Sequence, residues 1–223
     1  MKAPATRNKS KVTAFCCLLL AVLAVVWAAS AGGEKEENPG DYTVFGNSFA
    51  RLTSDSVEVF SRSGDLMYTV PLTGSGSVLT ASGETAALWS PGGGLLFLGE
   101  GGYRSAAVNG ELLGVFGSEC GAVCAICETG RSQFAVSVYS AAGEAFSLTA
   151  EGFFPLAAAV SPDGGELALL CADEAGYSVR TYSLRSGAAQ AETRLDGTAY
   201  SLTWDSGGLR AAYTDGEAII KGG

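Results

Sequence analysis

The sequence contains no histidine in its 223 residues and very little lysine, with only Lys35 and Lys221 beyond residue 11. Without histidine, the chain has no Ser-His-Asp or Cys-His nucleophile pair, no histidine ligand for zinc and no histidine proton relay. The scarcity of lysine leaves almost no candidate for a Ser-Lys dyad or a Schiff-base lysine. These absences exclude many classes of hydrolase and lyase, and the sequence predicts a protein that is not an enzyme and has no catalytic residue.

Proline is also scarce, with 6 residues, whereas glycine is abundant, with 31. Small residues, valine, leucine and turn formers make up much of the rest. This composition suits many short strands joined by tight turns more than it suits long helices.

Positive charge is unevenly placed along the chain. Four of the 14 basic residues are the only charged residues before residue 34, and all 23 acidic residues follow. The remaining body therefore has 10 basic residues against 23 acidic ones, a net charge of −13. An acidic body repels phosphate groups, so the charge argues against DNA or RNA as a partner, and its ordinary role is to keep the protein soluble.

Residues 12–31, VTAFCCLLLAVLAVVWAASA, carry no charge and are long enough to cross a bilayer at about 1.5 Å per helical residue. The basic tail at 1–11 and the acidic residues after the run place the N-terminus in the cytoplasm and the body outside. The alternative is a cleaved signal peptide with a small-x-small site at 29–31, which would make the protein secreted. The run exceeds the usual apolar core of about 7–15 residues, which favours a signal-anchor helix. Residues 32–41 form a polar tether, and 42–223 form the extracytoplasmic domain.

The body repeats a pattern of short apolar strands and Gly/Asp/Ser turns. Its clearest unit, at 156–195, predicts strands LAAAVS, ELALLCA, YSVRTYS and AAQAETRL, and four strands in roughly 40 residues is the period of a propeller blade. A V-x-V-[FY]-S or V-x-T-Y-S strand recurs at 57–61, 136–140 and 179–183, each followed by a turn that contains glycine. Residues 77–100 and 200–220 supply further strand sets.

We therefore expect an all-β domain of about four propeller-like blades, each with four antiparallel strands. The last set stops near residue 220 within its third strand, which would leave a strand edge exposed. We expect a truncated form; alternatively, N-terminal strands complete the ring or a partner covers the edge.

The SPDGGELALL…YSVRTYSLRSG unit resembles the WD-repeat-like blades of bacterial TolB-type propellers. From residue 42 to the end, and together with the predicted anchor, the chain also resembles a bacterial family of single-pass membrane proteins with an extracytoplasmic propeller, defined only as a domain of unknown function. The resemblance implies a β-propeller ectodomain, and it implies no catalytic or ligand-binding residue.

Three cysteines, Cys120, Cys124 and Cys127, have the spacing C-x3-C-x2-C, which is similar to the cluster motif of radical S-adenosylmethionine enzymes. Alignment of CAICETG at 124–130 with AAVSPDG at 158–164 instead predicts that they lie on the first, inner strand of a blade. At about 3.3 Å per residue, Cys124 and Cys127 would then lie ~10 Å apart on opposite faces, and Cys120 and Cys124 ~13 Å apart. That separation excludes a shared metal, a cluster or a disulfide among the three.

A disulfide between blades remains as the alternative, joining Cys171 to Cys124 or Cys127, because the export compartment permits it. The favoured interpretation is that these cysteines are buried free thiols, since alanine and serine occupy the matching positions elsewhere. The aspartates at 163, 173, 205 and 215 are expected to satisfy backbone donors in turns, because no D-x-D-x-D-G loop is present. The sequence thus predicts no metal and no cofactor.

Two functions remain, and the further alternative is a truncated propeller fragment without independent function. The first is a membrane-anchored extracytoplasmic propeller that binds a protein, a peptide or a cell-envelope ligand without catalysis. The second is a propeller hydrolase or lyase that uses only carboxylates, which needs two of them about 5–9.5 Å apart in a pocket. Small apolar side chains along the central channel would favour the first.

Overall fold

The computed structural model describes residues 42–72, 76–90, 94–214 and 216–220. The predicted basic tail, transmembrane helix and tether, together covering 1–41, lie outside these described residues. Within the described ranges, no helix is long and apolar enough to cross a membrane.

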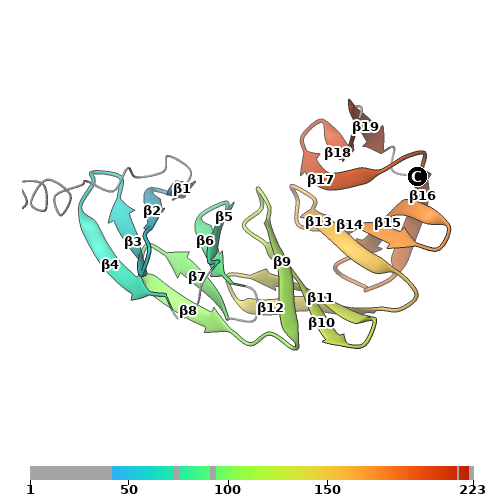
Figure 1. Cartoon of the computed structure of the whole chain (residues 1–223). Coiled ribbons are helices and arrows are strands. Elements are labelled where there is room, and N and C mark those ends of the chain that lie inside the picture. Colours follow the sequence, from blue (N-terminus) through green and yellow to red (C-terminus); the bar gives the residue numbers. More distant parts are fainter. Residues whose placement is uncertain (1–41, 73–75, 91–93, 215, 221–223) are drawn as a thin grey trace, which may run out of the picture. The chain divides into compact units, whose positions relative to one another are not determined.

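The described chain forms nineteen strands in five antiparallel sheets, and in each sheet every strand pairs with its neighbour along the chain (Figure 1). The first sheet contains β1 (Tyr42–Phe45), β2 (Ser48–Leu52), β3 (Ser56–Ser61) and β4 (Leu66–Pro71). The second contains β5 (Val78–Ser82), β6 (Thr85–Trp89), β7 (Leu95–Gly99) and β8 (Gly102–Ala106). The third contains β9 (Glu111–Gly117), β10 (Val123–Gly130), β11 (Gln133–Ser140) and β12 (Gly143–Ala150). The fourth contains β13 (Phe154–Val160), β14 (Glu166–Asp173), β15 (Gly176–Ser183) and β16 (Ala189–Leu195). The fifth contains β17 (Ala199–Asp205), β18 (Gly208–Tyr213) and β19 (Gly216–Ile220).

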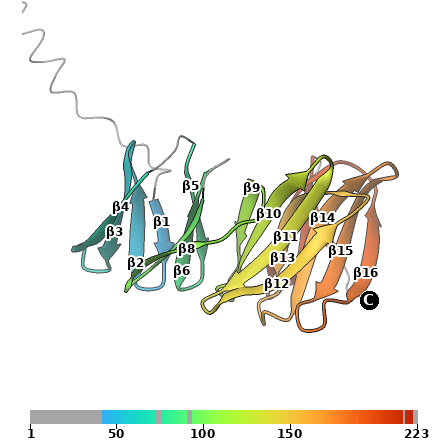
Figure 2. The ribbon, with the colours of Figure 1, turned by 90° about the horizontal axis from the view of Figure 1, so that it is seen from below.

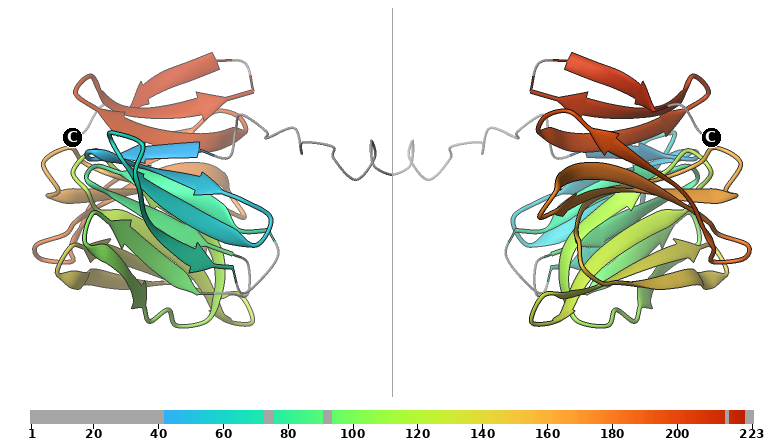
Figure 3. Two further views of the ribbon diagram at one scale, coloured as in Figure 1. Left: turned by 90° about the vertical axis from the view of Figure 1, so that its left-hand side faces the viewer. Right: turned by 90° about the vertical axis from the view of Figure 1, so that its right-hand side faces the viewer.

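The all-β, propeller-like fold expected from the sequence is therefore present, and the strands of the unit at 156–195 form one sheet. All three copies of the V-x-V-[FY]-S or V-x-T-Y-S pattern lie on the third strand of a sheet, namely β3, β11 and β15. The two side views in Figure 3 show that the strands are twisted, as is usual for β-sheets.

The described residues form four sheets of four strands and a last sheet of three, where about four blades with an incomplete last one were expected. The third sheet was predicted one strand out of step. The run VCAICETG forms β10, the second strand of its sheet, and the first strand is β9, which the sequence pattern did not reveal. The connection between β10 and β11 is a two-residue turn of Arg131 and Ser132, and Ser132 adopts the left-handed conformation with φ of 60°.

Among the described residues, four hydrophobic cores lie between successive sheets, so each core joins one sheet to the next along the chain. The core between the third and fourth sheets combines Cys124, Ile126, Val136, Val138, Ala158, Val160, Leu167, Leu169, Cys171 and Tyr182. The core between the fourth and fifth sheets takes the alternate residues of the same β14, Ala168 and Leu170, with Leu202, Leu209 and Ala211 from the last sheet. Figure 2 shows the third and fourth sheets side by side.

Burial on both faces explains the uninterrupted apolar runs of the second strands. Successive side chains of a strand point to opposite faces, so a strand between two cores has no polar face to expose. Leu167 through Cys171 on β14 are all fully buried, and so are Val123 through Ala125 on β10. An apolar run without alternation therefore marks a strand between two sheets in this protein.

Polar contacts reinforce the same boundaries between sheets. The Tyr68 hydroxyl on β4 donates to the Gly99 carbonyl of the second sheet at 2.7 Å, and the Tyr139 hydroxyl donates to the Ala107 carbonyl at 2.9 Å. The Ser82 hydroxyl at the end of β5 donates to the Ala122 carbonyl of the third sheet at 2.6 Å. Each bond satisfies a polar group where two sheets meet.

The first strands of the second and third sheets approach so closely that only glycine fits at one position. A Cβ atom on Gly117 of β9 would lie 1.8 Å from the carbonyl oxygen of Ala81 on β5. That oxygen belongs to the backbone and cannot rotate away, so any larger residue must push the two strands apart.

We expect Gly117→Ala to destabilise the fold, because overpacking of this kind costs about 1–3 kcal/mol and lowers the melting temperature by several degrees. The control is Gly101→Ala, where an added Cβ would meet no atom within 4 Å. Thermal unfolding followed by circular dichroism measures both variants. Equal melting temperatures for the two would contradict the close approach of β9 to β5.

Candidate functional site

A pocket of about 820 Å³ opens among the turns at one end of the second, third and fourth sheets. Five turns contribute to its lining, with residues 83–85, 119–122, 140–141, 163–165 and 184–185, and it is completed by Val138 and Ala145. We refer to it as the turn-lined pocket. Side chains held on turns above packed sheets are the usual arrangement of binding sites on β-scaffolds.

The turns around the pocket are held by hydrogen bonds within and between sheets. In the turn after β13, the Ser161 hydroxyl donates to the Asp163 carboxylate at 2.6 Å and accepts from the Glu166 amide at 2.9 Å. The Leu184 amide in the turn after β15 donates to the Gly165 carbonyl at 2.9 Å, which joins two turns of the fourth sheet. The pocket wall is therefore formed before any ligand arrives.

The second and third sheets meet at this pocket through glycine. Gly83 has φ of 55°, which favours glycine, and a Cβ atom there would lie 3.0 Å from the Cα atom of Gly121. On the other side, the Gly83 carbonyl accepts from the Gly46 amide of the first sheet at 3.0 Å. These contacts fix the backbone next to Glu84 and Cys120.

The pocket combines an apolar floor with a charged rim. Ala122, Val138 and Leu184 belong to, or pack against, the core between the third and fourth sheets. Glu84, Glu119, Asp163 and Arg185 on the rim are exposed. The hydrogen bond from Ser161, followed by that from the Gly165 amide, lowers the pKa of the Asp163 carboxyl, so this group is ionised at neutral pH.

A second, smaller cavity of about 380 Å³ is lined by residues from the first strand of every described sheet. Most of its lining is small or apolar, including Val44, Ala81, Gly117 and residues 158–160, while Glu119 and Asp205 are its carboxylates. The cavity thus combines mostly small and apolar side chains with the two carboxylates that the hydrolase would need, so its composition does not decide between the binding scaffold and the hydrolase. The absence of catalysis itself stays a prediction.

The structure separates the cysteines that the sequence places together. Cys120 is exposed in the turn between β9 and β10, and its Sγ atom lies 3.1 Å from the Ser118 hydroxyl. Cys124 and Cys127 are buried on β10 but face opposite cores, Cys124 towards the fourth sheet and Cys127 towards the second. Their opposite orientation agrees with the sequence interpretation, although they lie on the second strand and not the first. Within the described ranges, no group of three or more Cys, Asp or Glu side chains could hold a metal ion.

Cys120, Cys124, Cys127 and Cys171 are all free thiols in the structure. Cys171 shares its core with Cys124, whereas Cys127 belongs to the core on the far side of β10. The interblade disulfide stays a prediction, and of the two pairings the arrangement favours Cys171 with Cys124. Burial raises the pKa of the Cys171 thiol to about 12 and also raises the pKa of Cys124 and of Cys127.

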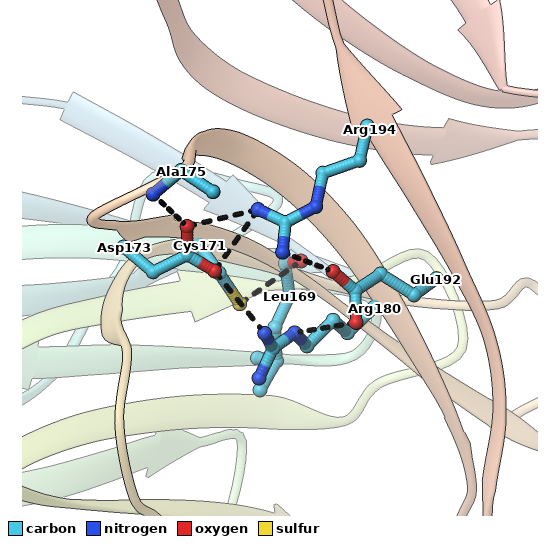
Figure 4. A network of polar contacts seen from close by, with 7 residues as sticks. All are labelled: Leu169, Cys171, Asp173, Ala175, Arg180, Glu192 and Arg194. Carbon is cyan, nitrogen blue, oxygen red and sulfur yellow. Dashed lines mark hydrogen bonds and ion pairs between the residues drawn. The ribbon is translucent and has the colours of Figure 1, made fainter.

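The charged residues beside Cys171 form a closed structural network (Figure 4). The Asp173 carboxylate accepts from Arg194 at 2.8 and 3.0 Å and from Arg180 at 3.3 Å, and Glu192 pairs with both arginines. The hydrogen bond from Arg194 is the main reason that the pKa of Asp173 is lowered. Because these four charges satisfy one another across β14, β15 and β16, they tie strands together and leave none for a ligand.

The turn aspartates behave as expected where they are described. Asp163 accepts from the Gly165 amide at 3.0 Å, and Asp205 accepts from the Gly207 amide at 2.6 Å. Asp215 lies outside the described residues. The sequence interpretation missed Glu84, Glu119 and Arg185 as site residues; Glu84 and Glu119 follow the first strands of their sheets, and Arg185 follows the third strand of the fourth sheet.

No protein-family model matches the chain, and no curated protein sequence matches it. The fold is similar to that of a chain in the crystal structure of a mitotic checkpoint complex, with a TM-score of 0.57 and 13% identity over 77% of this chain. It is also similar to Kluyveromyces lactis Hsv2p, with a TM-score of 0.60 and 14% identity over 78% of this chain. The matched regions span 56% and 58% of those two chains. At this identity the likeness shows the fold alone, a WD-repeat-like propeller architecture.

We expect Cys120 to be the reactive thiol among the cysteines at 120–171, because the other three are buried and protonated at pH 8. In the folded full chain, a maleimide should modify Cys120, while Cys124, Cys127 and Cys171 should react only after denaturation. Peptide mapping by mass spectrometry measures both states. Modification of Cys124 without denaturation would contradict the buried core, and a linked Cys124–Cys171 peptide from unreduced protein would establish the disulfide.

Proposed function

We propose that this protein is a non-catalytic propeller scaffold, anchored in the membrane by residues 12–31, that binds a protein or peptide segment outside the cytoplasm. The observation that carries the binding role is the turn-lined pocket, whose wall is preformed by turns of three sheets. The apolar, uncharged run with basic residues before it supports the anchor and its orientation. The presence of a similar fold in the mitotic checkpoint complex is consistent with a role in protein assembly.

A peptide or polypeptide segment fits this pocket better than a buried small molecule does. The opening is formed by exposed turns, and several of its lining residues, among them Ala141 and Ala145, are exposed. Small-molecule sites enclose most of the ligand surface, whereas grooves between turns suit extended chains. Cell-envelope glycans remain the alternative ligand.

The binding role predicts that filling the pocket abolishes binding. The full chain in detergent would be used to select binders from a phage-displayed library of random peptides. We expect binders whose affinity is lost with Ala141→Trp, which places an indole in the pocket. Ala142→Trp is the matched control, because Ala142 is an adjacent residue that is also exposed but lies outside the lining. If the two tryptophan variants bind every selected peptide as wild type does, the pocket is not the binding site.

The anchored topology predicts that Cys120 is accessible from outside the membrane. In bacterial spheroplasts that express the full chain, a membrane-impermeant maleimide should label Cys120, and Cys120→Ser should remove the label because Cys16 and Cys17 lie within the proposed span. Labelling only after permeabilisation would place the domain in the cytoplasm. Release of labelled protein into the medium would instead support the cleaved signal peptide.

A further inference from the structure

The rim of the turn-lined pocket carries more negative than positive side chains, and ion pairs within the described part of the chain do not neutralise the excess. Glu84, Glu119 and Asp163 come from three successive sheets, and Arg185 is the single basic residue of the lining. Among the described residues, Glu84, Glu119 and Arg185 make no ion pair with one another or with any other side chain. This contrasts with the network around Asp173, where every carboxylate is matched by a guanidinium group.

The floor beneath these carboxylates suits the stem of a long basic side chain. Ala122 and Leu184 are half-buried and present apolar surface that packs on the core between the third and fourth sheets, in which Val138 is buried. Lysine and arginine lay their methylene groups along apolar surface and direct the charged head towards a polar rim. The apolar part of the pocket can therefore contact the methylene groups of such a side chain, and the exposed carboxylates can pair with its charged head.

We propose that the turn-lined pocket selects an extended peptide segment that carries at least one lysine or arginine side chain, with its charge beside Glu84 and Glu119. This inference rests on the proposed function and names its partner class. The net charge of −13 for the body also favours a basic partner. It attracts basic segments and repels acidic ones before they reach the pocket.

The phage-selected peptides provide the probe for this inference. Among peptides whose binding is lost with Ala141→Trp, we expect lysine and arginine to be enriched over the unselected library. The double variant Glu84→Gln/Glu119→Gln should weaken these peptides by about three- to tenfold, as expected for two exposed charge pairs. Raising the salt concentration should weaken them as well.

The control is Glu151→Gln/Glu174→Gln, which removes the same charge from two exposed positions outside the pocket and should leave affinity unchanged. Pocket-dependent peptides without enrichment of basic residues, or with enrichment of acidic ones, would overturn the inference and leave the proposed function standing. An equal loss of affinity in the two double variants would also overturn it, because the attraction would then come from net charge and not from the pocket. If no pocket-dependent peptide is found, the inference and the proposed function both fail.

Discussion

The packing of each sheet against the next is the constraint on which the rest of the structure depends. A four-stranded antiparallel sheet has two faces, and the inner sheets of this chain bury both in the cores that they share with their neighbours. Sheets pack about 10 Å apart, so the side chains of the two faces must interlock. The position of every turn, and therefore of the turn-lined pocket, follows from this stacking.

The same constraint explains the unusual cysteines. A strand between two cores needs small or medium apolar residues on both faces, and cysteine is such a residue. Cys124 and Cys127 on β10 meet this need on opposite sides of one strand. Their spacing, which on paper is similar to a cluster motif, follows from double-sided burial and not from shared ligation.

Much of the fold could be predicted from the sequence because strand patterns are local. The unit at 156–195 and the three copies of the V-x-V-[FY]-S or V-x-T-Y-S pattern gave the right strands, since alternation and turn residues are visible within a few positions. The strand β9 was missed because Gly114 and Gly117 interrupt its apolar pattern. The reason for Gly117 lies in a different sheet, at the Ala81 carbonyl, which no local pattern can reveal. The pocket was missed for the same reason, because Glu84, Glu119 and Arg185 are ordinary turn residues until packing brings them together.

The pairing of every strand with its neighbour along the chain also bears on how the protein folds. Each sheet closes only short loops, so the loss of chain entropy before the first contacts form is small. The sheets resemble the units of a linear array, in which stability is a sum of internal terms and interfaces between neighbours. A chain of this kind can form one sheet after another as its segments leave the ribosome. Each new sheet can then pack against the apolar face of the sheet that formed before it.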